Sequence, residues 1–356
     1  MHKSIATSTI LEHELSELRL LVERQTGVVL DCPNSALSAH VADFIEAQEW
    51  DCSSSLLERL RSPEQDPSTL PSLLDGLLSG NTGFFRHPGA LNALTRQVLP
   101  QLCSRRSADS PGPIRIWSAG CATGEETYSI AMAVCDAVSP VNGNVSNNGN
   151  GSGNGSGKAG RNGGIAENLP VAAGQPPVKL HAGSIHIVGS DLLPRNIEAA
   201  DRGIYRQSAV EGLPPATIRN YFSKIGTPAV ATTAVLSDSE SDGDCPNGCE
   251  PPAVTAHLLV KPRLRSLVTF NRMNLARPGY IGRFDCIFCM DVLPHFSRVQ
   301  RLAVLERLHL YLEPGGYLFL SQTEKLAASN LNFRSETFDG YTFHRKPLAA
   351  SAAYGR

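Results

Sequence analysis

The sequence contains no run of about 18 or more consecutive apolar residues, so it offers no candidate for a membrane-spanning helix. Its first 20 residues lack the apolar centre of an export signal and become acidic and amphipathic instead. An excess of charge of one sign is also missing, because the formal net charge is only −2 and charged residues make up 19% of the chain. This excludes the strongly basic composition that is typical of nucleic-acid binders. We expect a cytoplasmic protein that neither inserts into a membrane nor binds nucleic acid.

Cysteine occurs nine times, but never in the spacing of a metal site. Cys286 and Cys289 lie on a predicted strand, where side chains three positions apart point to opposite faces. Cys245 and Cys249 lack the second pair of ligands that a zinc site needs. We therefore predict no metal site, a buried apolar role for the first pair, and free thiols in a reducing compartment.

Glycine and proline are abundant, with 31 and 24 copies, and the glycines are unevenly distributed. Between residues 142 and 164, 19 of 23 residues are Gly, Asn or Ser. A segment with so few apolar side chains buries too little surface to offset the entropy of ordering it, which predicts a flexible loop. Residues 226–254 hold an acidic SDSESDGD tract and a Pro-rich PNGCEPP tract. We therefore expect two low-complexity insertions, at about 139–178 and 226–254.

The rest of the 356 residues divides into two patterns. Apolar residues recur at helical spacing over 12–80, which predicts a small all-α N-terminal domain. From Ile114 onward, short β-rich segments alternate with helical segments. This alternation predicts an α/β domain over 81–350, built on a doubly wound, mainly parallel sheet. Asp339 and Gly340 stand between two further β-rich segments and predict a hairpin turn.

Ligands of such sheets bind outside the carboxyl ends of the strands. After the first strand, Gly120 and Gly124 form a GxxxG spacing, not the GxGxxG that binds a dinucleotide pyrophosphate. Glu125 and Glu126 follow at the start of the next helix, where phosphates would need positive potential. These acids favour a cationic, hydroxyl-rich ligand such as S-adenosylmethionine. An equally good interpretation is that they only stabilise the first helical turn through the helix dipole.

Asp191 ends the second β-rich segment, where a carboxylate can accept hydrogen bonds from both hydroxyls of a ribose. It lies 71 residues after Gly120, whereas a βαβ unit spans about 30 residues. Without the 37 residues from 142 to 178, the separation is 34. We infer that the glycine-rich loop is inserted into the first crossover of an ordinary nucleoside-binding unit.

Six segments in the same order resemble the CheR-type chemotaxis-receptor methyltransferases, which transfer methyl from S-adenosylmethionine to glutamate side chains. The family's segments read TxFFR, RIWSAxCSTGEEPYS, an acid after the second strand, ARxGIY, an NL pair, and FCRNVxIYF. This chain has TGFFR at 82–86, RIWSAGCATGEETYS at 115–129, Asp191, ADRGIY at 200–205, NL at 274–275, and FCMDVLPHF at 288–296. The match covers nearly the whole chain outside the two insertions.

The resemblance implies a seven-stranded S-adenosylmethionine-dependent methyltransferase sheet and a protein-glutamate O-methyltransferase, with S-adenosylhomocysteine as product. It implies that the cofactor is bound by Thr82, Arg86, Gly120, Glu125, Glu126, Asp191, Asn274, Leu275, Cys289 and Met290. Arg86 and His295 are the implied catalytic residues. Because a glutamate acceptor is already ionised at neutral pH, the reaction needs alignment and exclusion of water but no general base. Without the motif, Arg86 is equally consistent with a surface ion pair and Asn274 with a turn.

Three positions depart from the family pattern. The family's Asn two residues before the Thr is replaced by Gly80, with Asn81 beside it. The Arg-Asn pair on the fourth strand is Met290-Asp291 here. The tyrosine of the family's IYF ending, which the resemblance assigns to the substrate carboxylate, is replaced in this chain by Pro-His-Phe with His295. These departures leave two alternatives open: a catalytically impaired signalling module that binds S-adenosylmethionine, and a small-molecule methyltransferase.

The implied partner is the cytoplasmic domain of a methyl-accepting chemoreceptor or a similar signalling protein, bound by a monomeric enzyme. In the family a basic helix of the N-terminal domain docks on the acidic receptor bundle, whereas residues 34–44 here contain no Lys or Arg. The basic run at 257–265 occupies the place of the family's small β-subdomain, which helps receptor docking. A short hairpin leading into the third strand explains the same run equally well.

Overall fold

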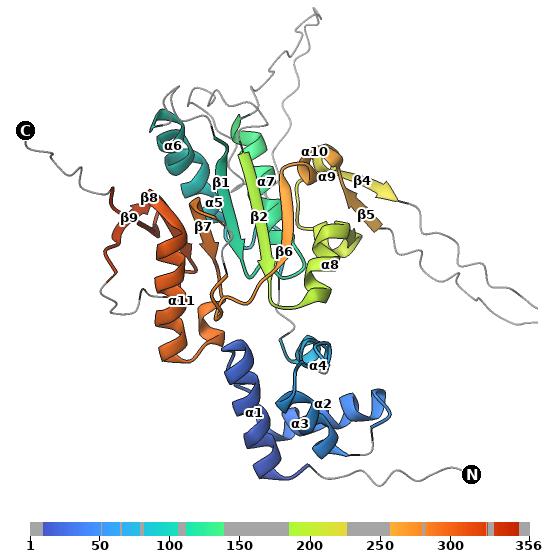
Figure 1. The fold of residues 1–356 in the computed structure, drawn as a ribbon. Helices are drawn as coiled ribbons and strands as arrows, with labels where there is room; N and C mark the ends of the chain where they lie inside the picture. Colours follow the sequence, from blue (N-terminus) through green and yellow to red (C-terminus); the bar gives the residue numbers. More distant parts are fainter. Residues whose placement is uncertain are drawn as a thin grey trace, which may run out of the picture.

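The computed structural model of the chain describes residues 10–50, 52–64, 66–78, 82–105, 112–138, 185–225, 257–279, 282–324, 326 and 331–348. Both predicted insertions lie outside these residues, as do the predicted boundary between 80 and 81 and the pair Gly80 and Asn81. A small group of helices lies below the carboxyl ends of the strands of an α/β sheet (Figure 1). None of the helices in the described ranges is long and apolar enough to cross a bilayer.

Four helices form this N-terminal group: α1 Glu12–Thr26, α2 Asn34–Ala47, α3 Ser53–Arg61 and α4 Thr69–Leu77. Each contributes apolar residues at helical spacing to one shared core. Leu18, Leu37, Leu56 and Leu73 are each no more than 2% exposed in this core. Leu193, which follows the second strand of the sheet, reaches into the same cluster. The helical group therefore packs against the sheet domain through apolar contacts.

The large sheet has the strand order β6-β2-β1-β7-β8-β10-β9. Its seven strands are β1 Ile114–Ala119, β2 Ile185–Asp191, β6 Val268–Arg272, β7 Phe284–Cys289, β8 Leu312–Leu320, β9 Arg334–Phe338 and β10 Tyr341–Arg345. The first five in spatial order run parallel. β10 runs antiparallel to both of its neighbours, β8 and β9. The predicted mainly parallel, seven-stranded α/β sheet is confirmed. The hairpin turn is also confirmed, because Asp339 and Gly340 join β9 to β10 with φ of 48° and 76°.

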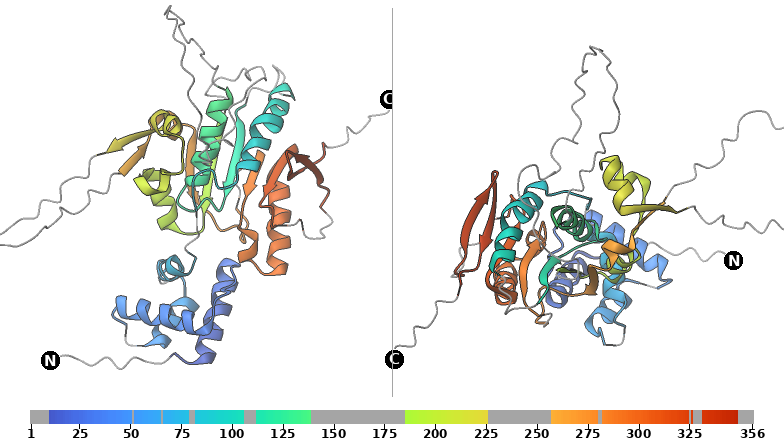
Figure 2. Two further views of the ribbon diagram at one scale, coloured as in Figure 1. Left: turned by 180° about the vertical axis from the view of Figure 1, so that it is seen from behind. Right: turned by 90° about the horizontal axis from the view of Figure 1, so that it is seen from above.

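Helices cover both faces of this sheet (Figure 2). One face packs on α5 Pro88–Ala93, the π-helical turn Leu94–Val98, α6 Leu99–Arg105 and α7 Glu125–Val138. The other face packs on α11 Arg298–Tyr311. Cys286 belongs to the first core and Cys289 to the second, and both are fully buried. The predicted opposite orientation and apolar role of these two thiols are confirmed, as the alternation of side chains along a strand requires.

A second sheet, with the antiparallel order β3-β5-β4, follows α8 Pro194–Arg202. It is built from β3 Ile204–Arg206, β4 Phe222–Ile225 and β5 His257–Val260, with the 3-10 turn Gln207–Val210, α9 Pro215–Tyr221 and α10 Pro262–Arg265. β5 is the central strand and pairs on both sides. The run at 257–265 therefore belongs to a small three-stranded β-subdomain, and its antiparallel pair β4-β5 leads through α10 into β6.

The C-terminal end of α1 attaches the helical group to the sheet domain. Val28 forms an antiparallel bridge with Phe296. The side chains of Asn274 and Arg277, in the loop after β6, donate hydrogen bonds to the carbonyl of Gln25 at 3.2 and 3.3 Å. A basic side chain at this position satisfies a carbonyl that the helix leaves unpaired and complements the helix dipole. The two parts of the molecule thus meet at the carboxyl ends of the strands.

Gly27 ends α1 and directs the chain into this contact. Its φ is 77°, and a Cβ atom there would lie 2.4 Å from the Cβ of Ala276. Because both the backbone conformation and the space exclude a side chain, Gly27→Ala is expected to lower the free energy of unfolding by about 1–3 kcal/mol. Urea denaturation measures this change. Gly279→Ala is the control, since nothing lies within 4 Å of a Cβ at that position. Equal stability of the two variants would contradict the expectation.

Candidate active site

A cavity of about 370 Å³ lies where the carboxyl ends of the parallel strands meet the helical group. Its wall combines residues from the end of α1, the segment 82–87, the loop after β1, the end of β2, the loop after β6 and the segment 290–296. Small-molecule sites in proteins measure about 300–1,000 Å³. Ligands of open α/β sheets bind at this edge. The cavity therefore has the size and the position of a ligand site.

The loop after β1 folds onto the end of β2. The amides of Gly120 and Cys121 both donate to the carbonyl of Ser190, at 2.8 and 2.9 Å. Gly120 has a φ of 83°, and a Cβ atom there would lie 2.4 Å from the side chain of Val292. Glycine is required at this turn because any larger residue would be strained and would collide. The turn brings Gly120 and Asp191 to the same wall of the cavity.

Asp191 lines the cavity, and three hydrogen bonds hold its carboxylate in place. The donors are the amides of Ala122 and Leu193 and the side-chain amide of Asn196, at 3.0, 2.9 and 2.9 Å. Burial raises the pKa of Asp191, and these hydrogen bonds oppose the shift. A carboxylate oriented in this way can accept hydrogen bonds from ribose hydroxyls at the cavity wall.

The two acids at the start of α7 point in different directions. The carboxylate of Glu125 accepts a hydrogen bond from the hydroxyl of Thr123 at 2.7 Å, and Glu125 is not part of the cavity wall. Glu126 does line the cavity, and its carboxylate accepts a hydrogen bond from the hydroxyl of Ser118 at 2.7 Å. Burial raises the pKa of Glu126 to about 7, and the charges of two other carboxylates act in the same direction. Glu126 is thus a cavity carboxylate whose charge changes near neutral pH.

The segment 82–87 is fixed against α7 and the β-subdomain. Phe85 has a φ of 53°, and its amide donates to the hydroxyl of Ser129 at 2.9 Å. Phe84 packs edge-on against two rings of the β-subdomain, with centroid distances of 4.9 and 5.4 Å. These contacts define the path of the backbone just before Arg86. Thr82 and Arg86 both line the cavity.

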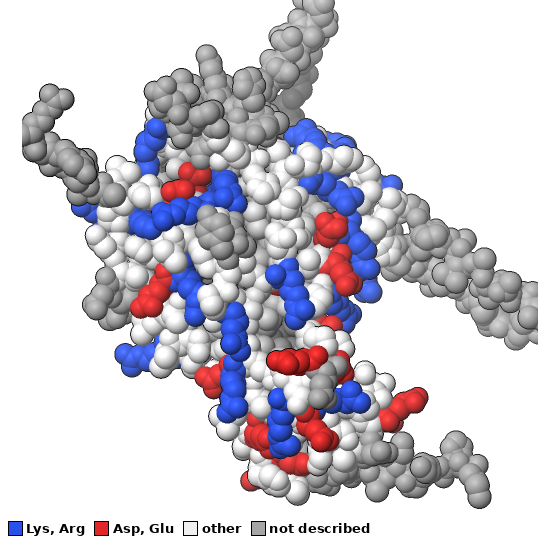
Figure 3. Space-filling model, viewed as in Figure 1, with Lys and Arg blue, Asp and Glu red and all other residues white. Residues whose placement is uncertain are grey.

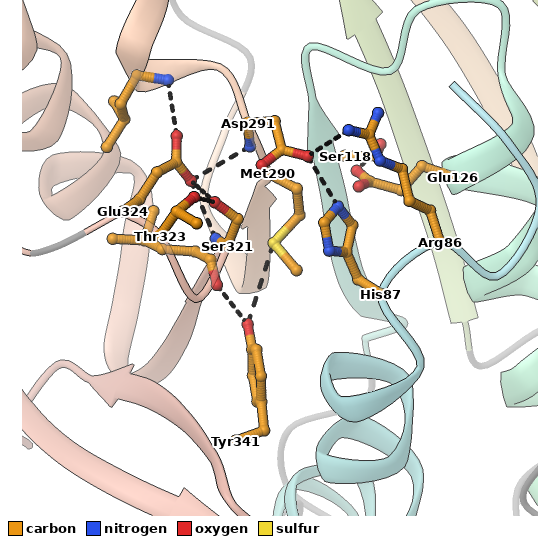
Figure 4. A network of polar contacts seen from close by, with 12 residues as sticks. Arg86, His87, Ser118, Glu126, Met290, Asp291, Ser321, Thr323, Glu324 and Tyr341 are labelled. Carbon is orange, nitrogen blue, oxygen red and sulfur yellow. Dashed lines mark hydrogen bonds and ion pairs between the residues drawn. The ribbon is translucent and has the colours of Figure 1, made fainter. Parts of the chain in front are cut away.

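Arg86 and His87 contact the same carboxylate oxygen of Asp291 (Figure 4). Nη2 of Arg86 lies 3.3 Å from this oxygen, and Nε2 of His87 lies 3.1 Å from it. The side chain of Arg86 is 46% exposed and that of Asp291 is 35% exposed, so the contact lies at the cavity surface. Asp291 has a φ of 58°, which Asp and Asn tolerate better than most residues.

Glu324 fixes the loop that carries Asp291 (Figure 4). Its carboxylate accepts hydrogen bonds from the amides of Asp291, Leu293 and Ser321, at 3.2, 2.9 and 2.9 Å. This loop continues into the 3-10 turn Leu293–His295. Sequence reasoning misses both Glu324 and His87. The signal for Glu324 is its place just after β8, and the signal for His87 is its place next to the TGFFR segment.

The structure brings nine of the eleven predicted site residues to the cavity wall: Thr82, Arg86, Gly120, Glu126, Asp191, Asn274, Leu275, Met290 and His295. Glu125 and Cys289 do not line it. Cys289 is fully buried in the core on the α11 side of the sheet. Asn274 also shapes the turn after β6, since its side-chain oxygen accepts a hydrogen bond from the amide of Ala276 at 2.8 Å. The turn interpretation of Asn274 is confirmed, alongside its place in the wall.

The charges of the cavity suit a cationic nucleoside better than a phosphate. Glu126 and Asp191 place carboxylates on its wall, and Arg86, which pairs with Asp291, adds a guanidinium. S-adenosylmethionine carries a sulfonium, an ammonium group and ribose hydroxyls, which carboxylates can bind, and a carboxylate, which a guanidinium can bind. Leu275 and Met290 add apolar wall for a base. The residues present therefore fit this cofactor.

Comparison of the chain with known proteins identifies its family. The model of "CheR methyltransferase, SAM binding domain" matches residues 80–146 and 252–341. "Chemotaxis protein methyltransferase 1" of Pseudomonas aeruginosa is 28% identical over 311 residues, which cover 86% of this chain and 88% of that protein. "Chemotaxis protein methyltransferase Cher2" of Pseudomonas putida is 25% identical over 317 residues, covering 88% and 90%. The residues matched by the family model include three parts of the cavity wall: the segment with Arg86, the loop after β1 and the loop with Asp291. The chain belongs to the CheR methyltransferase family and uses S-adenosylmethionine as its cofactor.

Proposed function

We propose that the protein transfers the methyl group of S-adenosylmethionine to glutamate side chains of a methyl-accepting chemoreceptor or a related signalling protein. The product is a glutamate methyl ester, and the enzyme acts as a monomer in the cytoplasm. The observation that carries the proposal is the guanidinium of Arg86 in the same cavity wall as Glu126 and Asp191. Such a wall can hold a cationic cofactor and an anionic acceptor next to each other. The printed names of the relatives support a role in chemotaxis.

The side chains of the cavity can perform this reaction by positioning alone. The bound cofactor supplies an electrophilic methyl group on a positively charged sulfur. Asp191 is placed to hold ribose hydroxyls and Glu126 to hold a cationic group, while Arg86 holds the acceptor carboxylate by charge-assisted hydrogen bonds. A glutamate with an ordinary pKa near 4.3 is already ionised, so no residue has to remove a proton. His295, on the exposed rim of the cavity, is placed to donate a hydrogen bond to the entering acceptor.

Transfer of a radioactive methyl group tests the proposal directly. The protein is incubated with tritiated S-adenosylmethionine and receptor cytoplasmic domains, and base-labile methanol is measured, since methyl esters release methanol in base. We expect release that depends on both protein and receptor. Cofactor binding by calorimetry without any transfer would instead support the impaired signalling module. Transfer to small acceptors alone would support the small-molecule methyltransferase.

The charge of the helical group argues against its use as the receptor-docking surface. Residues 12–80 contain 13 acidic residues and four Lys or Arg. Figure 3 shows acidic side chains gathered over this part of the molecule. An acidic receptor bundle would be repelled by such a surface. We propose that the receptor docks on the β-subdomain instead, where Arg206 on β3 and Lys224 on β4 are exposed.

Reversing the charge of the β-subdomain is therefore expected to weaken receptor recognition. In the variant Arg206→Glu/Lys224→Glu, KM for the receptor should rise about fivefold or more with kcat unchanged, because the lost attraction affects encounter and docking. Initial rates over a range of receptor concentrations measure this. Arg334→Glu is the control, since this exposed residue lies on β9 at the other edge of the large sheet. An equal effect of the control would assign the result to net charge and not to the β-subdomain.

A further inference from the structure

Four charged groups interact across one side of the cavity. Burial raises the pKa of Glu126 first, the charges of Asp291 and Glu324 raise it further, and Arg86 lowers it. An acceptor glutamate would bring a further carboxylate to the same guanidinium. Two carboxylates at one guanidinium repel each other. The acceptor therefore enters favourably only if a resident carboxylate gives up its contact with Arg86.

The contacts of Asp291 identify it as the carboxylate that can move. Glu324 and Asp191 bind main-chain amides and thereby hold loops in place. Within the described residues, the carboxylate of Asp291 has hydrogen bonds and ion pairs only with the side chains of Arg86 and His87. Its main-chain amide is bound separately by Glu324. The loop therefore keeps its shape without the Asp291 carboxylate.

We propose that Asp291 is a resident competitor of the acceptor: it occupies Arg86 until the acceptor carboxylate displaces it, and His87 then retains it. This inference rests on the proposed function and adds a determinant of acceptor affinity to it. Arg86 and His87 contact one and the same oxygen, at 3.3 and 3.1 Å. The carboxylate can therefore leave the guanidinium and keep the imidazole. Asp291 and His87 are positioning residues in this scheme, because neither touches the reacting atoms.

The family pattern indicates why this feature belongs to this chain. Where the CheR segments read Arg-Asn, this chain reads Met290-Asp291. An asparagine there is neutral and does not compete for a guanidinium. It also tolerates the left-handed conformation, with a φ of 58°, that Asp291 adopts. Asp291→Asn is thus a change of charge that the backbone accommodates.

Steady-state kinetics with separate kcat and KM test the proposal. In Asp291→Asn, KM for the receptor should fall about twofold to fivefold with kcat unchanged, the range expected for a partly exposed ion pair. In His87→Gln, KM should rise about twofold, because Asp291 loses its alternative partner. The double variant Asp291→Asn/His87→Gln should behave like Asp291→Asn alone. Asp339→Asn is the matched control, since Asp339 has a similar φ of 48° in the β9–β10 turn. An unchanged or higher KM in Asp291→Asn would overturn the proposal. So would a double variant in which His87→Gln raises KM as much as it does in the wild type.

A second measurement works without methyl transfer. Phenylglyoxal modifies accessible guanidinium groups, and mass spectrometry of the peptide containing Arg86 gives the rate. Modification should be about twofold to fivefold faster in Asp291→Asn than in the wild type, and unchanged in Asp339→Asn. An equal rate in Asp291→Asn and the wild type would overturn the pairing. The two proposals can fail separately. If the wild type methylated no receptor but Arg86 was modified faster in Asp291→Asn, the proposed function would fail. Asp291 would then still compete for Arg86, but with an anionic ligand other than a receptor glutamate.

Discussion

Replacement of Arg86 by alanine is expected to reduce kcat/KM for receptor methylation by about 100-fold or more. The guanidinium lies in the cavity wall and is the cation that can hold the acceptor carboxylate in line with the methyl group. Because the acceptor needs no deprotonation, the rate depends on alignment, and lost alignment typically costs about 100-fold. Arg86→Lys should recover only part of the rate, since an ammonium group keeps the charge but not the fork of donors.

The measurement has to separate the acceptor from the cofactor. Calorimetric titration with S-adenosylhomocysteine shows whether the Arg86 variants still bind the cofactor product. If its affinity is unchanged while transfer is lost, Arg86 acts on the acceptor. A parallel loss of both would place its main contact on the cofactor. Arg334→Ala, at the far edge of the sheet, serves as the control. Full transfer by Arg86→Ala would contradict the role given to this side chain.

The fold could be predicted because each local pattern agrees with the global arrangement. Alternation of β-rich and helical segments specifies a parallel sheet, and Asp339-Gly340 specifies its antiparallel hairpin. The position of Asp191 became predictable only after the low-complexity residues were subtracted from its distance to Gly120. The β-subdomain does not follow from local patterns, because β3 and β4 pair with β5 across long separations in the chain that no local pattern encodes.

The site was predictable by segment but not always by side chain. Glu125 and Glu126 are adjacent on a helix, where a step of one residue rotates the side chain by about 100°. Composition cannot decide which acid faces the ligand, and the structure selects Glu126. Cys289 and Met290 present the same difficulty at a strand end, where consecutive side chains point to opposite faces. Met290 lines the cavity and Cys289 faces the core.

Residues whose role depends on contacts with distant parts of the chain cannot be predicted from local sequence patterns. Glu324 binds three amides of two loops, and nothing in its own neighbourhood shows that those amides lie there. The contact of His87 with Asp291 joins residues 204 positions apart. Such contacts follow from the sheet bringing strand ends together, which is a property of the whole fold.

The affinity of the protein for S-adenosylmethionine is expected to increase with pH up to about 7 and then to level off. Burial raises the pKa of Glu126 from 4.5 to about 7, so below pH 7 its carboxyl group is mainly protonated. A cationic ligand beside Glu126 binds the ionised form better, so the association constant should fall about tenfold for each pH unit below 7. The folding stability of the unliganded protein should change with pH in the opposite direction. A raised pKa in the folded state means that its stability decreases as pH rises from 4.5 to about 7.

Isothermal titration calorimetry at several pH values, in buffers of different ionisation enthalpy, measures both the affinity and the proton released on binding. Glu126→Gln should remove the pH dependence and the proton release, because the amide does not titrate. Glu125→Gln is a closely matched control: it changes the same type of residue in the same helical turn, but Glu125 does not line the cavity. This control should keep the wild-type slope. If Glu126→Gln kept the slope instead, the titrating group would lie elsewhere in the cavity, and the cation-binding role of Glu126 would have to be abandoned.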